Sequence, residues 1–83
     1  MPYEVFLEKR ALKQLESFPT DDKVRLKETL IQMKDFPTGL DVKKLVGSGN
    51  KYRVRIGKLR VLMELEPGQI IVFDILHRKK AYK

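Results

Sequence analysis

Cysteine and tryptophan are both missing from this 83-residue chain, and no apolar run approaches the length that a membrane-spanning helix requires. Without cysteine, disulfide frameworks and thiol chemistry are excluded, which suits a cytoplasmic protein. The first ten residues contain acidic side chains and lack the layout of a secretory signal peptide. Repeats and low-complexity tracts are missing too. We therefore expect one small cytoplasmic domain over residues 1–83, folded around a modest apolar core without a metal or other cofactor.

Positive charge is abundant and unevenly distributed. The formal net charge is +7. Residues 1–50 contain nine basic and eight acidic side chains, whereas residues 51–83 contain nine basic and only three acidic ones. This concentration of charge predicts an anionic partner. The alternative is a basic surface that serves only solubility.

The first part of the chain predicts a strand followed by a helix. Residues 3–7 are rich in β-forming side chains. Over residues 8–18, an apolar stripe at helical spacing is formed by Ala11, Leu12, Leu15 and Phe18. Pro19 ends this helix because proline cannot continue it.

A second helix is expected directly after Pro19. Thr20 or Asp21 can cap it, and the acidic residues Asp21 and Asp22 suit the positive end of its dipole. Its apolar stripe consists of Leu26, Leu30 and Met33, flanked by Val24 and Ile31. The segment "FPTG" at 36–39 stops the helix. The two helices therefore form a hairpin in which each has one face to bury.

The second half of the chain reads as strands. Residues 42–50 form a short strand at most, followed by a glycine loop, and strands follow at 51–56, 59–66 and 70–77. We therefore predict an α+β fold, β-α-α-β-β-β(-β), with the helical hairpin packed on one face of a mostly antiparallel sheet. The residues expected to be buried are Val54, Ile56, Val61, Met63, Leu26 and Leu30.

A two-residue turn at Gly57-Lys58 fixes the register of the hairpin that surrounds it. One face then carries the pairs Ile56/Leu59, Val54/Val61 and Tyr52/Met63, and the other carries Arg55/Arg60, Arg53/Leu62 and Lys51/Glu64. Like charges directly opposite each other are destabilising. The opposed Arg55 and Arg60 therefore predict a bound anion, and arginine is suited to bidentate contact with phosphate. The alternative is a solvated basic face that prevents aggregation.

The last strand can be placed by the same alternation. Its residues Ile71, Phe73 and Ile75 best face the apolar row Leu65, Met63 and Val61, which requires an odd-length loop around "PGQ". In this register Arg78 joins the face of Arg53, Arg55 and Arg60. Tyr82 follows four residues later and offers a ring on which a nucleotide base can stack.

Three short motifs resemble the RelE toxins of bacterial and archaeal toxin–antitoxin pairs, within the RelE/ParE superfamily. They are "KLVG" at 44–47, "YRVRIGKLR" at 52–60 and "LHRKKAY" at 76–82, and the archaeal-type members look closest. The resemblance implies a metal-independent endoribonuclease that enters the ribosomal A site and cuts mRNA there. The 2′-hydroxyl of a ribose attacks the adjacent phosphate, which gives a 2′,3′-cyclic phosphate and a free 5′-hydroxyl. It further implies a cognate antitoxin and contacts with ribosomal RNA.

The family's active-site positions correspond to Arg53, Arg55, Arg60, Arg78 and Tyr82. The best-known member has lysines at the positions of Arg53 and Arg55, one of them proposed as general base, and arginine cannot take that role. Either the arginines act by positioning and charge stabilisation, or the proton is moved by His77, Glu64 or Lys51. His77 is expected to point toward the helices, so a structural role is an alternative for it. Contacts with the RNA backbone are assigned to Lys51, Lys58, Lys79, Lys80 and Lys83.

Two other functions fit the same fold, because fold does not decide function. One is a ParE-like toxin, which poisons DNA gyrase by binding and is not a nuclease. The other is a basic RNA-binding module without catalysis. The arginine-paired strands and the "HRKKAY" segment favour the ribonuclease.

Overall fold

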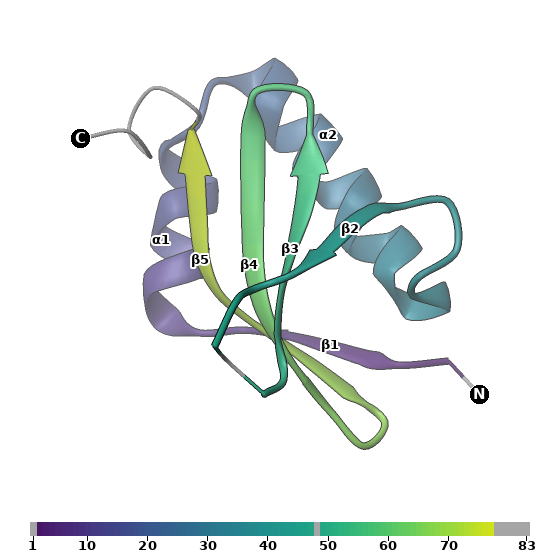
Figure 1. Ribbon diagram of the computed structural model, residues 1–83. Coiled ribbons are helices and arrows are strands. Elements are labelled where there is room, and N and C mark those ends of the chain that lie inside the picture. Colours follow the sequence, from purple (N-terminus) through teal and green to yellow (C-terminus); the bar gives the residue numbers. More distant parts are fainter. Residues whose placement is uncertain (1, 48, 78–83) are drawn as a thin grey trace.

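Two helices lie against one face of a five-stranded sheet (Figure 1). The computed structural model describes residues 2–47 and 49–77. Its elements are β1 (Glu4–Leu7), α1 (Lys9–Ser17), α2 (Thr20–Gln32), the short 3-10 helix η1 (Met33–Asp35), β2 (Asp41–Lys44), β3 (Lys51–Ile56), β4 (Leu59–Glu66) and β5 (Gln69–His77). The strand order is β1-β5-β4-β3-β2, with β1 parallel to β5 and the other neighbours antiparallel. The predicted α+β fold is confirmed.

Helix α1 buries a narrower stripe than its sequence predicts. Ala11 and Leu15 are buried, whereas Leu12 is 47% exposed. The difference arises because α1 turns the side that carries Gln14 toward β5. The Gln14 amide donates to Oδ1 of Asp74 at 2.6 Å, and its Oε1 accepts from the backbone N–H of Ile75 at 2.7 Å. Strand β1 pairs with β5 only as far as Val72. Gln14 therefore provides the hydrogen-bond acceptor for the N–H of Ile75, which lies beyond the end of β1.

Helix α2 begins directly after Pro19, at Thr20. Pro19 occupies the N-cap position, and no side chain caps the helix, so the prediction of a cap at Thr20 or Asp21 was wrong. Proline suits this position because its backbone has no N–H to leave unpaired. Asp21 and Asp22 do lie in the first turn, as predicted. Val24 and Ile31 are exposed.

The core lies between the helices and the covered face of the sheet. Of the six residues predicted to be buried, Leu26, Val54, Val61 and Met63 have no exposed surface. The other two, Leu30 and Ile56, are half-buried and pack against the core. No helix in the described ranges 2–47 and 49–77 is long and apolar enough to span a membrane.

The predicted register of β5 holds only at its C-terminal end. Val61 pairs with Ile75 as expected, but Met63 pairs with Val72, and a β-bulge lies between these pairs. The turn between β4 and β5 has two residues, with Gly68 at φ 71°, so the odd-length loop was wrong. Because the bulge absorbs one residue, Val72 and Ile70 face the core in place of Phe73 and Ile71.

Candidate functional site

The hairpin of β3 and β4 has the register that its turn predicts. Gly57 has φ 56°, and the six pairs run from Ile56/Leu59 to Lys51/Glu64. Buried Val54, Val61 and Met63 point to the helices, so the alternating residues lie on the opposite face of the sheet. No helix covers that face in the described part of the chain (Figure 1). Three of its residues, Arg53, Arg55 and Arg60, define what we call the arginine face.

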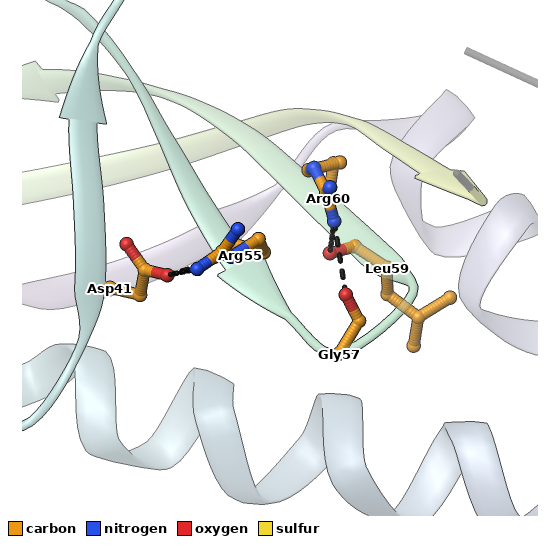
Figure 2. Close-up of polar contacts among 5 residues, drawn as sticks. All are labelled: Asp41, Arg55, Gly57, Leu59 and Arg60. Carbon is orange, nitrogen blue, oxygen red and sulfur yellow. Dashed lines mark hydrogen bonds and ion pairs between the residues drawn. The ribbon is translucent and has the colours of Figure 1, made fainter. Parts of the chain in front are cut away.

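Arg55 has an anionic partner within the protein. Its Nε and Nη2 both contact Oδ2 of Asp41, each at 2.7 Å (Figure 2). Asp41 begins β2 and is the Cα partner of Arg55 across the β2–β3 pair. A carboxylate of the protein itself therefore offsets the charge of Arg55, which the sequence analysis did not foresee because it did not place β2 beside β3. The two side chains are 52% and 47% exposed, so water screens the pair strongly.

Arg60 turns away from Arg55. Its Nη1 donates to the backbone carbonyls of Gly57 and Leu59, at 3.1 Å each (Figure 2). These carbonyls belong to the β3–β4 turn and the residue that follows it. The Arg55/Arg60 pair predicted from the register is therefore present, but each guanidinium has its own partner.

Arg53 lies on β3, two residues before Arg55. It lies between Lys43 of β2 and Leu62 of β4 in the sheet register, and its side chain is half-buried. Its Nε is buried and has no hydrogen-bond partner among the described residues. Leaving a buried donor unpaired is costly, and a ligand's oxygen atom reaches this N–H only if the Arg53 side chain moves to expose it.

Lys51 and Glu64 lie opposite each other on the same side of the sheet as the arginines. The Nζ atom of Lys51 lies 5.5 Å from the centre of the Phe73 ring, a cation–π contact. Phe73 was predicted to face the core and is instead half-buried on this side, where the bulge places it. Sequence reasoning missed this aromatic residue because no residue pattern marks the bulge.

His77 lies on the other side of the sheet. It pairs with buried Leu59 and lines a hollow of about 820 Å³ between the sheet and α2. Lys58 lines this hollow as well. Arg25 and Asp21 of α2 line the same hollow. The structure therefore places His77 on the side of the sheet opposite the arginine face, whereas Lys58 lies in the turn that joins β3 and β4. The orientation predicted for His77, toward the helices, is the one observed.

Five predicted site residues lie outside the described residues: Arg78, Lys79, Lys80, Tyr82 and Lys83. Within the described ranges, no group of three or more His, Cys, Asp or Glu side chains is arranged to hold a metal ion. The described part of the site thus consists of three arginines, with Asp41, Lys51, Glu64 and Phe73 around them.

Comparison with known proteins finds similarity over almost the whole chain. A family model described as the ParE toxin of the type II toxin–antitoxin system parDE matches residues 5–82. RelE1 of Methanocaldococcus jannaschii is 38% identical over 88 residues, which cover 100% of this chain and 98% of RelE1. A chain of the RelB–RelE antitoxin–toxin complex from Methanococcus jannaschii has a TM-score of 0.82 at 30% identity, covering 93% of this chain and 94% of that one. A chain of the RelE–RelB complex from Pyrococcus horikoshii has a TM-score of 0.80 at 29% identity, covering 94% and 97%.

Proposed function

Because this chain belongs to the RelE/ParE superfamily, as a RelE-type toxin of type II toxin–antitoxin systems, we propose that it is an endoribonuclease. Its substrate would be mRNA in the ribosomal A site. The observation that carries this proposal is the arginine face, which presents three guanidinium groups from neighbouring strands on the side of the sheet that no described helix covers. Arginine binds phosphate in a bidentate manner, and RNA supplies phosphates in a row.

The proposed reaction is attack of a ribose 2′-hydroxyl on the adjacent phosphate. A bond forms between the 2′-oxygen and phosphorus, and the bond to the 5′-oxygen of the next nucleotide breaks. Negative charge grows on the other phosphate oxygens during this exchange. Arg53 and Arg55 would stabilise that charge, and together with Arg60 they would hold the backbone in line for attack. Arginine stays protonated, so these residues would not move the proton themselves.

Two other groups on this side of the sheet can move protons. The Glu64 carboxylate would accept the proton of the 2′-hydroxyl, and the Lys51 ammonium would give one to the departing 5′-oxygen. In the register these two residues lie opposite each other, two residues along each strand from the Arg53/Leu62 pair. His77 has no part in this scheme because it lies on the helix side.

We further propose a cognate antitoxin as partner, because the two archaeal structures similar to this chain are complexes of a toxin with RelB. An acidic segment of the antitoxin would neutralise the arginine face, which agrees with the excess of basic residues after position 50. A ribosomal target places the activity in the cytoplasm.

The proposal is tested by adding the purified chain to a translation extract that contains a defined mRNA. Primer extension should show new 5′ ends within the codon at the A site, and only when ribosomes are stalled on that mRNA. Intact mRNA at a toxin concentration equal to that of the ribosomes would overturn the proposal.

Inhibition of DNA gyrase is the second candidate, because the matching family model is described by a ParE toxin. A supercoiling assay with purified gyrase separates the two functions. The ribonuclease proposal predicts unchanged supercoiling at concentrations that cut ribosome-bound mRNA. Inhibited supercoiling together with intact mRNA would favour the ParE-like function.

A further inference from the structure

We infer that Asp41 competes with RNA phosphates for Arg55 and thereby sets how tightly the arginine face binds RNA. This inference rests on the proposed function, because it takes RNA as the ligand of that face. The contact in Figure 2 carries it: Oδ2 of Asp41 accepts from both Nε and Nη2 of Arg55, at 2.7 Å each. These two nitrogens form one of the guanidinium edges with which arginine binds a phosphate. The carboxylate therefore takes a position that a phosphate oxygen would use.

The exposure of the pair makes this competition reversible. Arg55 is 52% exposed and Asp41 is 47% exposed, so an incoming RNA strand can reach both groups. Exposed ion pairs contribute little to stability because water screens them. The pair can therefore open without disturbing the core, and Arg55 can exchange the carboxylate for a phosphate.

Contacts with the neighbouring arginines determine whether an RNA phosphate displaces Asp41 from Arg55. A phosphate that contacts Arg55 alone replaces one anion by another and gains little. A phosphate that also reaches Arg60 or Arg53 gains contacts that Asp41 does not make. Arg60 donates to two backbone carbonyls, and Nε of Arg53 has no hydrogen-bond partner among the described residues. Asp41 thus selects RNA that bridges several arginines and disfavours isolated contacts.

Removing the charge of Asp41 has opposite effects on RNA binding in a positioning model and in the competition model. If the carboxylate served to orient Arg55 for RNA, its loss would weaken binding. In the competition model its loss strengthens binding, because the guanidinium edge of Arg55 that Asp41 occupied becomes available to the RNA.

The test uses the full chain and a fluorescein-labelled dodecamer of 2′-O-methyl RNA, which lacks the attacking hydroxyl and so is bound without being cut. Fluorescence anisotropy gives the Kd for the wild type, Asp41→Asn, Arg55→Ala and the double variant. Asp35→Asn is the control for net charge, since Asp35 is an exposed acid in η1. Asp41→Asn should bind about three- to tenfold more tightly at low salt, and the gain should shrink as salt rises.

The double variant decides between competition and a general charge effect. Competition for Arg55 predicts that Asp41→Asn gives no gain when Arg55 is already alanine. An equal gain in that background, a gain matched by Asp35→Asn, or weaker binding by Asp41→Asn would each overturn the inference. If Arg55→Ala itself leaves RNA binding unchanged, Arg55 is no RNA contact, and both this inference and the proposed site fail.

Discussion

Arg55 and Arg60 are direct partners across β3 and β4, yet one guanidinium is bound to a carboxylate and the other to backbone carbonyls. This difference predicts different effects on folding. Arg60→Ala removes two hydrogen bonds that close the β3–β4 turn, and it should lower the free energy of unfolding by about 0.5 to 1.5 kcal/mol. Arg55→Ala removes only an exposed ion pair and should change it by less than about 0.5 kcal/mol. Denaturant melts measure both, and equal losses would contradict the assignment.

A second prediction concerns Gln14, which links α1 to β5 through both ends of its amide. Gln14→Ala leaves the N–H of Ile75 without this partner and should cost about 1 to 3 kcal/mol of stability. Lys13→Ala, on the exposed side of the same helix, is the matched control and should be neutral. If Gln14→Ala and Lys13→Ala unfold at the same denaturant concentration, Gln14 does not stabilise β5.

The turn that sets the register supplies a third prediction. Gly57 has φ 56°, and a Cβ there would lie 3.3 Å from Nη1 of Arg25. Gly57→Ala should therefore cost about 1 to 2 kcal/mol, because an L-residue is strained in this conformation. A Cβ at Gly49 would have no atom within 4 Å of it, so Gly49→Ala serves as control. A Gly57 variant that melts with the control would contradict the turn assigned here.

The sequence predicted the register of the β3–β4 hairpin, because the Gly57-Lys58 turn and strict alternation determine all six of its pairs. It did not predict the partner of Arg55. Asp41 is 14 residues away in the chain, and its place beside Arg55 depends on the pairing of a four-residue edge strand. The bulge in β5 was not predicted from the sequence either. Residues 70–73 are all apolar, so their alternation does not determine which of them face the core. Packing against the helices buries Val72 and leaves Phe73 on the other side of the sheet.

A fourth prediction separates the two faces of the sheet. His77→Asn should leave cleavage of ribosome-bound mRNA within about threefold of wild type, since His77 lies on the helix side. Glu64→Gln should reduce the rate by about a hundredfold, the scale of losing a general base. Single-turnover rates on stalled ribosomes measure both, and the reverse ranking would reassign proton transfer to His77.

The most direct test of the proposed function is primer extension on ribosome-bound mRNA with Arg53→Ala. The Nε of Arg53 lacks a hydrogen-bond partner in the described structure, so its replacement should leave no partner of that atom unpaired, while it removes one guanidinium group of the arginine face. Lys27→Ala, which removes an exposed cation from α2, is the matched control. We predict that Arg53→Ala cuts A-site mRNA at least about a hundredfold more slowly than both the wild type and Lys27→Ala, with an unchanged melt. A folded Arg53→Ala protein that cuts at the wild-type rate would contradict the assignment of the arginine face as the active site.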